Sequence, residues 1–191
     1  MAARSRSPIA SVVALWSAVV GLSLLVPERS FAQETSKPDV WAPFRYFLGS
    51  WEGTSKGQAG DGKVELSFQL VMNDRYLEVR NRSTYPPQEK NPKGEVHEDR
   101  GMVSFDKARK TYVYRQFNSE GFVNQYAMDA ASADGKTFVF SSESIENIPP
   151  GWRARETYRI ISSDEFVSQF DLAEPGKDFE VYSQIRLKRK Q

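Results

Sequence analysis

The stretch KVELSFQLVM, residues 63–72, alternates polar and apolar side chains along its length. Its apolar members fall at every second position: Val64, Leu66, Phe68, Leu70 and Met72. Successive side chains of a β-strand point to opposite faces, so a period of two predicts a strand with one buried face and one solvated face. This segment therefore predicts a protein built on a β-sheet.

Segments with the same rhythm recur along most of the remaining chain. We expect further strands at residues 50–57, 75–85, 96–105, 111–118, 121–130, 136–145, 152–161, 165–172 and 178–189. Short turn sequences, such as GDG at 60–62 and ADG at 133–135, separate them. Links this short join antiparallel neighbours, because a parallel crossover needs a dozen or more residues. The predicted fold class is all-β, an antiparallel up-and-down barrel of about ten strands that leaves no open edge.

One short helix is expected before the first strand. Val40, Phe44, Phe47 and Leu48 have the spacing of one helix face. Asp39 can cap the amino end, and Gly49 is expected to end the helix.

Composition narrows the classes of function. The 191 residues contain 26 basic and 25 acidic side chains, a net charge of +1, one His and no Cys. A near-neutral charge argues against a nucleic-acid partner, since such proteins normally carry a basic excess. Without Cys there can be no disulfide, thiolate metal site or Cys nucleophile. With His97 as the single histidine, a multi-histidine metal centre is excluded, and we expect no metal.

Residues 1–32 have the pattern of a secretory signal peptide. Arg4 and Arg6 precede an uncharged stretch from residue 9 to residue 26, and Ser30-Phe31-Ala32 offers small residues where a signal peptidase needs them. The alternative is an uncleaved anchor, because the uncharged stretch is near the lower length limit of a spanning helix. Contact with a membrane is expected only through this segment.

The expected mature protein is therefore exported, periplasmic or extracellular. A polar stretch at 33–39 predicts a flexible leader, and residues 40–191 predict a single β-barrel domain. Two longer connections contain several prolines, YPPQEKNPKGE at 85–95 and NIPPG at 147–151. Long loops on a rigid barrel often surround a ligand mouth or contact a partner.

A small barrel either fills with side chains or keeps a cavity for one small ligand. We expect a small apolar or amphipathic molecule in the barrel, because barrels commonly bind ligands at the interior or mouth. The predicted ligand-binding side chains are Phe68, Tyr112, Tyr114, Phe138, Phe140, Trp152 and Glu156. In the last strand, simple alternation places Val181, Ile185 and Leu187 on one face, opposite Tyr182 and Arg186.

Glu156 shares a strand face with Trp152 and Tyr158. If that face points inward, the carboxyl group must be paired or neutralised. Basic partners available on other strands are Arg80, Arg100 and Arg115.

Two other functional classes stay open. One is a small barrel enzyme that uses Glu156 or His97 as a general acid or base. Only Asp99 shares the strand face of His97, so a metal site there is a weak prediction, and we expect a surface histidine beside the proline-rich loop instead. The other class is a partner-binding protein of the cell envelope that uses the proline-rich loop at 85–95.

The segment FLGSWEG, residues 47–53, carries a resemblance to a known superfamily. A Gly-x-Trp in the first barrel strand after a short helix resembles the calycins, which include lipocalins. The resemblance implies that Trp51 closes one end of the barrel and that a basic residue of the last strand, Arg186 or Lys188, covers it. The sequence looks closer still to nitrobindin-like barrels and to related uncharacterised exported bacterial proteins.

Nitrobindin-like proteins hold haem through a histidine near the C-terminal strands. This sequence has no histidine after His97, so the family's haem ligand does not carry over. Tyr158 or Tyr182 would have to replace it, since tyrosine ligates ferric iron in some haem proteins. We therefore expect no cofactor, with haem as the alternative.

Overall fold

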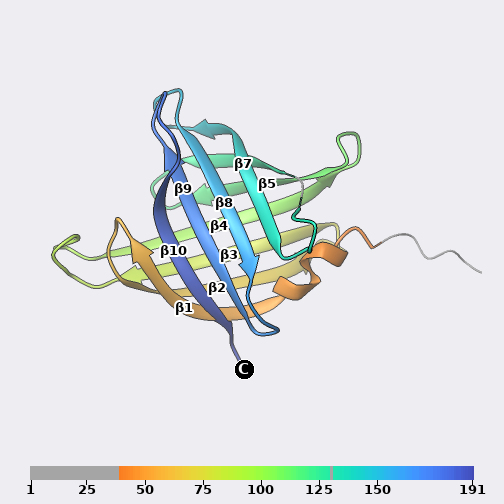
Figure 1. Ribbon diagram of the computed structural model, residues 1–191, viewed down its shortest axis with the longest axis horizontal. Helices are drawn as coiled ribbons and strands as arrows, with labels where there is room; N and C mark the ends of the chain where they lie inside the picture. Colours follow the sequence, from red (N-terminus) through yellow and green to blue (C-terminus); the bar gives the residue numbers. More distant parts are fainter. Residues whose placement is uncertain (1–38, 130) are drawn as a thin grey trace, which may run out of the picture. The chain divides into compact units, whose positions relative to one another are not determined.

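Antiparallel strands close into a barrel in the computed structural model, which describes residues 39–129 and 131–191 (Figure 1). The predicted signal peptide at 1–32 lies outside the described residues, as does nearly all of the predicted leader. The described strands are β1 (Gly49–Gly57), β2 (Gly62–Val71), β3 (Tyr76–Tyr85), β4 (Glu95–Asp106), β5 (Thr111–Asn118), β6 (Val123–Met128), β7 (Thr137–Glu146), β8 (Arg153–Ile160), β9 (Glu165–Ala173) and β10 (Glu180–Arg189).

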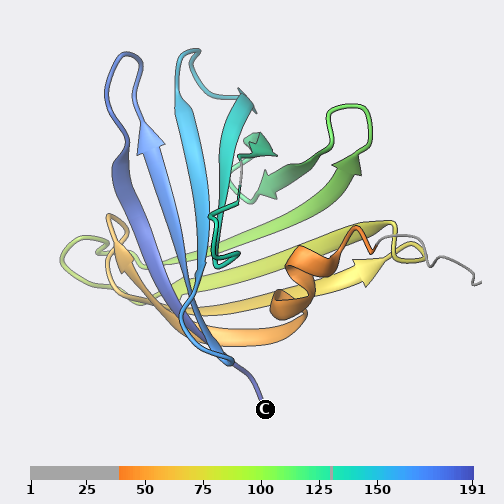
Figure 2. The ribbon, with the colours of Figure 1, turned by 45° about the vertical axis from the view of Figure 1, so that its right-hand side comes forward.

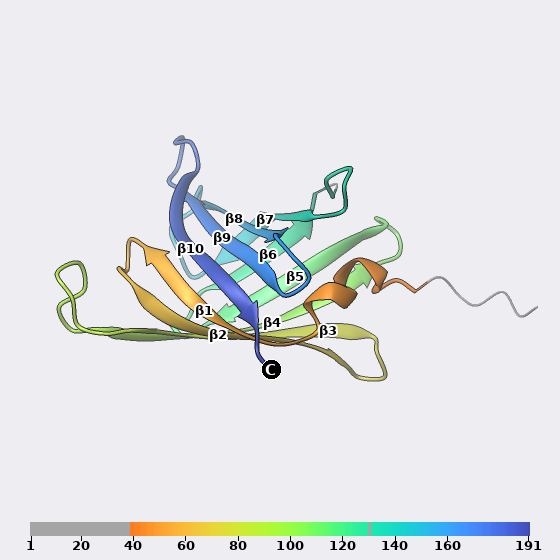
Figure 3. The same ribbon diagram turned by 60° about the horizontal axis from the view of Figure 1, so that its bottom comes forward.

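Each strand pairs with its neighbour in sequence, and β1 pairs with β10 to complete the circle. Figure 3 shows β10 lying beside β1. These pairings confirm the predicted all-β, up-and-down barrel, and every strand lies within a few residues of its predicted range. No helix among the described residues is long and apolar enough to cross a membrane.

Strand β2 follows its sequence pattern closely. Val64, Leu66 and Phe68 are buried in the barrel, while the residues between them are exposed or half-buried. Met72 differs from the prediction, because it is exposed and begins the tight turn to β3 with a positive φ of 53°. The alternating pattern of the sequence therefore extends one residue beyond the end of β2, into the turn.

Strand β10 departs from simple alternation at a β-bulge. Its register with β9 shifts between Val181 and Ser183. An extra residue reverses which side chains face inward on one side of the bulge. Val181 is 53% exposed as a result, whereas Tyr182 lines the interior and Leu187 is fully buried. The predicted grouping of Val181 with Leu187 is therefore wrong.

A short 3₁₀ helix, η1 (Ala42–Phe47), lies at the end of the barrel where β1 begins (Figure 2). The sequence predicted a helix here, and the structure makes it shorter and more tightly wound. Pro43 lies in its first turn, and 3₁₀ turns are frequent as connectors before a strand. Its Phe44 and Phe47 side chains insert into the barrel and are buried.

The helix is tied to the turns around it. The Trp41 indole Nε1 donates to the carbonyl oxygen of Asp74 in the β2–β3 turn at 2.7 Å. The Tyr46 hydroxyl donates to the carbonyl oxygens of Ser162 and Glu165, in and after the β8–β9 turn, at 2.9 Å each. We call this closed end, with η1 and its aromatic neighbours, the plugged end.

Trp51 lies at the plugged end, fully buried, and its Nε1 donates to the Phe47 carbonyl oxygen at 2.7 Å. The basic residue that covers it is Arg189 and not the predicted Arg186. The Arg189 guanidinium lies 4.1 Å from the Trp51 ring centroid and donates to the carbonyl oxygens of Leu48 and Tyr46. Arg186 faces outward, one position from the buried Leu187, and pairs with Glu165.

Candidate functional site

The opposite end of the barrel contains a cavity of about 430 Å³. Strand direction explains its position, because η1 occupies the end where the odd-numbered strands begin, and the cavity reaches the end where they finish. Both proline-containing loops border it, since Tyr85 and Glu95 flank the first loop and Ile148 and Pro149 lie in the second. Its volume is within the range of about 300–1,000 Å³ typical of small-molecule sites.

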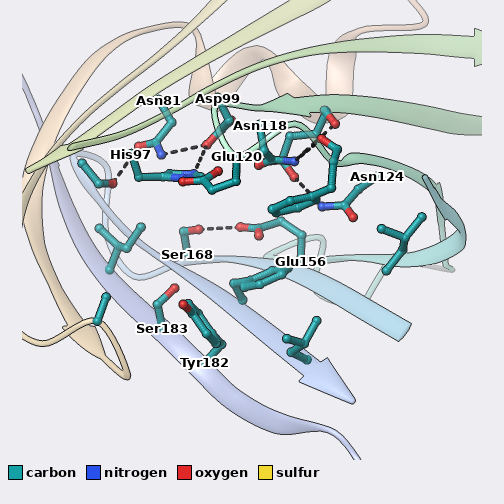
Figure 4. A pocket seen from close by; sticks show the side chains of 18 of the residues that line it. Asn81, His97, Asp99, Asn118, Glu120, Asn124, Glu156, Ser168, Tyr182 and Ser183 are labelled. Carbon is teal, nitrogen blue, oxygen red and sulfur yellow. Dashed lines mark hydrogen bonds and ion pairs between the residues drawn. The ribbon is translucent and has the colours of Figure 1, made fainter. Parts of the chain in front are cut away.

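The cavity has two chemically different walls. Strands β6 to β10 and their loops supply most of the apolar wall, whose members include Phe122, Ile145, Ile148, Trp152, Phe170, Leu172 and Ile185. Strands β3 to β6 and their turns supply the polar wall, with Asn81, His97, Asp99, Gln116, Asn118, Glu120 and Asn124. Figure 4 shows labelled members of the polar wall across the cavity from Tyr182 and Ser183.

The structure divides the predicted ligand-binding residues between the two ends. Tyr114, Trp152 and Glu156 line the cavity. The other four belong to the aromatic core around η1 and do not line it: Phe68, Tyr112, Phe138 and Phe140. The reason is steric, because Phe44 and Phe47 fill the space that a ligand would need. The Phe44 ring centroid is 4.7 Å from that of Tyr112, and the Phe47 centroid is 5.4 Å from that of Phe68.

Glu156 faces the interior on β8 and is only 6% exposed. The Ser168 hydroxyl on β9 donates to its Oε1 at 2.6 Å. No basic side chain of the described chain pairs with it, and the candidate partners Arg80 and Arg100 instead approach Glu78. Burial raises the pKa of the Glu156 carboxyl to about 8, against the lowering effect of the Ser168 hydrogen bond. The group is therefore neutralised by protonation rather than paired.

His97 on β4 is half-buried and lies between two carboxylates. Its Nδ1 is 2.8 Å from Glu120 Oε1, and its Nε2 is 3.3 Å from Asp99 Oδ2. Burial lowers the pKa of the imidazole, but the two hydrogen bonds and the nearby charges outweigh burial and raise it to about 9. His97 is therefore protonated at neutral pH and donates from both ring nitrogens.

Two acceptor atoms on the polar wall have no hydrogen-bond partner. Asp99 Oδ2 accepts from Asn81 Nδ2 at 2.8 Å and from His97, but Asp99 Oδ1 is buried and accepts nothing. Asn124 Nδ2 donates to Gln116 Oε1 at 3.3 Å, while Asn124 Oδ1 is also unpaired. Buried polar atoms are nearly always satisfied, so each exception needs an explanation.

Tyr114, beneath these groups, depends on a glycine in the neighbouring strand. A Cβ at Gly101 of β4 would lie 2.1 Å from the Tyr114 ring, which real structures do not tolerate. Gly101 therefore lets the ring lie flat against the β4 backbone, where it stacks on Tyr126 at 5.6 Å between centroids. This packing forms the floor of the cavity.

Glu95, His97 and Glu120 could together hold a metal ion. Each offers one ligand atom, and these atoms lie within 4.8 Å of one another. The sequence predicted only the weak pair of His97 and Asp99, because Glu120 comes from a separate turn. In this structure the imidazole already donates to Glu120 and Asp99, so a metal ion would first have to displace a proton from it.

The cavity residues do not fit haem. The hydroxyl of Tyr158 is buried and its pKa is raised well above 10 by burial, so the tyrosinate needed as an iron ligand is disfavoured. Burial also raises the pKa of Tyr182. Among the described lining residues there is no Lys or Arg to pair with haem propionates.

Comparison with known proteins supports the barrel fold and does not identify a function. The crystal structure of Rv2717c from M. tuberculosis matches with a TM-score of 0.56 and 15% identity, over 79% of this chain and 97% of that chain. A de novo designed fluorescence-activating β-barrel matches with a TM-score of 0.38 and 14% identity, over 76% of this chain and 94% of its own. No protein-family model and no curated protein matches this sequence. The nitrobindin-like part of the resemblance stays a prediction.

Sequence reasoning missed most of the polar wall. Asn81 and Asn124 drew no attention because each lies in a strand with polar residues on both faces. That absence of alternation was itself a usable signal. An inward strand face that is polar indicates a cavity, since a packed core would be apolar there.

Proposed function

We propose that this protein binds a small amphipathic molecule inside the barrel. The observation that carries the proposal is the cavity of about 430 Å³, with one apolar wall and one polar wall. Ligand sites are typically largely apolar, with a few polar groups that fix orientation. Asp99 and Asn124, which line this cavity, each keep one side-chain oxygen without a hydrogen-bond partner, so the hydrogen-bonding capacity of the polar wall is not fully used within the protein.

A fluorescence titration tests this proposal. The neutral apolar dye N-phenyl-1-naphthylamine should bind with a stoichiometry near one and brighten on transfer from water. Leu172→Trp adds bulk to the cavity wall and should weaken dye binding at least tenfold. The matched control is Ile161→Trp, since Ile161 is exposed and lies outside the cavity lining. Equal dye binding by the two variants would place the dye outside the barrel and contradict the proposal.

An acid–base enzyme of the same shape is the second candidate, and one observation favours it. Glu156 is a buried carboxyl with a pKa of about 8 inside a cavity large enough for a substrate. Such a group can donate and accept a proton near neutral pH. The first test is the pKa of Glu156 measured by NMR in the folded protein, because an unshifted carboxyl would remove this candidate.

Export belongs to the same proposal. The support is the pattern of residues 1–32, with its small residues at the cut. Expression of the full chain in a bacterium, followed by mass spectrometry of the periplasmic fraction, should give the mass of a protein that begins at Gln33. A full-length mass in the membrane fraction would indicate an uncleaved anchor instead.

A further inference from the structure

Acidic groups outnumber basic groups on the cavity lining. Glu95, Asp99 and Glu120 line it beside the protonated Glu156, and His97 is the one basic side chain among the described lining residues. A cavity surrounded by low-dielectric walls strengthens the field of such charges at its centre. An anionic group on a ligand would be repelled there, and a cationic group would be attracted.

The unpaired atoms specify the ligand more closely than charge does. Asp99 is 8% exposed and Asn124 is 2% exposed, and the unpaired atom of each is an oxygen that can only accept a hydrogen bond. Their other side-chain atoms are already used, by Asn81 and His97 in one case and by Gln116 in the other. Neither oxygen has appreciable accessible surface in this structure, so a ligand reaches them only when the two side chains turn toward the cavity, and it must then bring donors.

We propose that the ligand has an apolar body and a cationic nitrogen group, an amine or amidine, that donates hydrogen bonds to Asp99 Oδ1 and Asn124 Oδ1. This inference rests on the proposed binding function. The apolar body lies against the wall formed by residues such as Trp152, Phe170 and Leu172. The same arrangement selects against a fatty-acid carboxylate, which is anionic and can donate nothing to these oxygens.

Three eight-carbon probes that differ only in their head group test the inference. Octylamine is cationic at pH 7, octanol is neutral and octanoate is anionic. We expect octylamine to displace N-phenyl-1-naphthylamine at about tenfold lower concentration than octanol, because hydrogen bonds between charged groups are stronger than those of a neutral hydroxyl. Octanoate should bind more weakly than octanol.

Asp99→Asn is the sharpest variant. Both existing donors contact Oδ2, so the amide oxygen takes that position and the amide NH₂ takes the place of the unpaired Oδ1. A donor then faces the donor of the ligand. We expect the preference for octylamine over octanol to disappear while octanol binding is kept.

Two further variants distinguish an effect at the cavity from misfolding and from a change in net charge alone. Glu120→Gln changes an exposed member of the polar wall, and we expect it to reduce the preference for octylamine about threefold. Glu52→Gln removes the same charge from the exposed face of β1, away from the lining, and should leave the preference unchanged. Thermal melting of each variant checks the fold.

The outcomes separate the two proposals. If the dye and all three probes fail to bind, the proposed binding function fails. If octanol or octanoate binds as tightly as octylamine, or Asp99→Asn and Glu120→Gln both keep the preference, the cationic ligand is ruled out and the binding function stands.

Discussion

The same strands build two very different ends of this barrel. At the plugged end, Phe44, Phe47 and Trp51 fill the interior, and the polar atoms of Trp51 and Arg189 are hydrogen-bonded. At the cavity end, the interior holds a carboxyl without a basic partner and two oxygens without any partner. The barrel axis therefore separates a close-packed aromatic end from an end that keeps a cavity.

The contrast between a close-packed end and a cavity end has a physical reason. A fully satisfied, close-packed interior stabilises the fold but leaves nothing for a ligand to contact. Local violations of good packing and hydrogen bonding are expected where a protein functions, and other regions compensate for them. The predictions that follow test whether the two ends behave in this opposite way.

The largest effect is expected from Phe47→Ala. This side chain is fully buried and its ring packs against Phe166 and Tyr158 at centroid distances of 5.1 and 5.6 Å. Its loss should lower the free energy of unfolding by roughly 3–5 kcal/mol. Urea unfolding measures the loss, with Phe117→Ala as control because Phe117 is 55% exposed. Equal effects of the two substitutions would contradict the role given to the plug.

Glu156→Gln should stabilise the protein. The unfolded carboxyl has the ordinary pKa of 4.5 and the folded one about 8, so folding is favoured by this group below pH 4.5 and loses stability as pH rises through 8. Glutamine keeps the acceptor for Ser168 without this cost, and the gain should be roughly 3 kcal/mol at pH 7. Urea unfolding at pH 4 and pH 7 checks it. A destabilised variant at pH 7 would show that the carboxylate is ionised and paired.

Arg189→Ala should cost roughly 2 kcal/mol, because the substitution removes a cation–π contact with Trp51 and leaves the Leu48 and Tyr46 carbonyl oxygens without this donor. Arg186→Ala is the matched control, since the Arg186 guanidinium is largely exposed and solvent screens its pairing with Glu165. Thermal unfolding distinguishes the two. A larger loss with Arg186→Ala would restore the residue that the sequence predicted.

The smallest effect is expected from His97→Gln. The pKa of the imidazole is about 9 in the folded protein against 6.5 in the unfolded chain, so its stabilising effect is fully present below pH 6.5 and is lost as pH rises through 9. Solvent reaches Glu120, which reduces the effect to on the order of 1 kcal/mol. The difference in stability between His97→Gln and the parent should be present at pH 6 and vanish at pH 10.

The backbone elements of the plugged end were predictable from sequence, but the filling of its interior by Phe44 and Phe47 was not, so four residues of its core were predicted as ligand-binding. Alternation in residues 63–72 indicated a strand, and the apolar spacing before Gly49 indicated a helix. The family resemblance of FLGSWEG implied that Trp51 closes one end of the barrel. The identity of the covering arginine was not predictable by analogy alone, since its position depends on the register between β1 and β10.

The cavity end was predictable only in part. Glu156 and Trp152 could be placed on one strand face because residues 152–160 alternate, and the structure shows that this face points inward. The pairing of Asn81 with Asp99 could not be inferred, because it depends on the β3–β4 register, which a strand with polar residues on both faces leaves unspecified. The β-bulge at Tyr182 could not be predicted either, since one extra residue in a strand does not change its composition recognisably.

The pairing of β1 with β10 also bears on the order in which the protein is made and folds. Trp51 lies opposite Arg189 in the register, so nearly the whole described chain separates the two partners. Contacts between such distant segments form slowly, because the loop between them must first be closed. One edge of β1 therefore stays without its hydrogen-bond partner until the last strand has left the ribosome. We expect the nascent barrel to depend on protection from aggregation up to that moment.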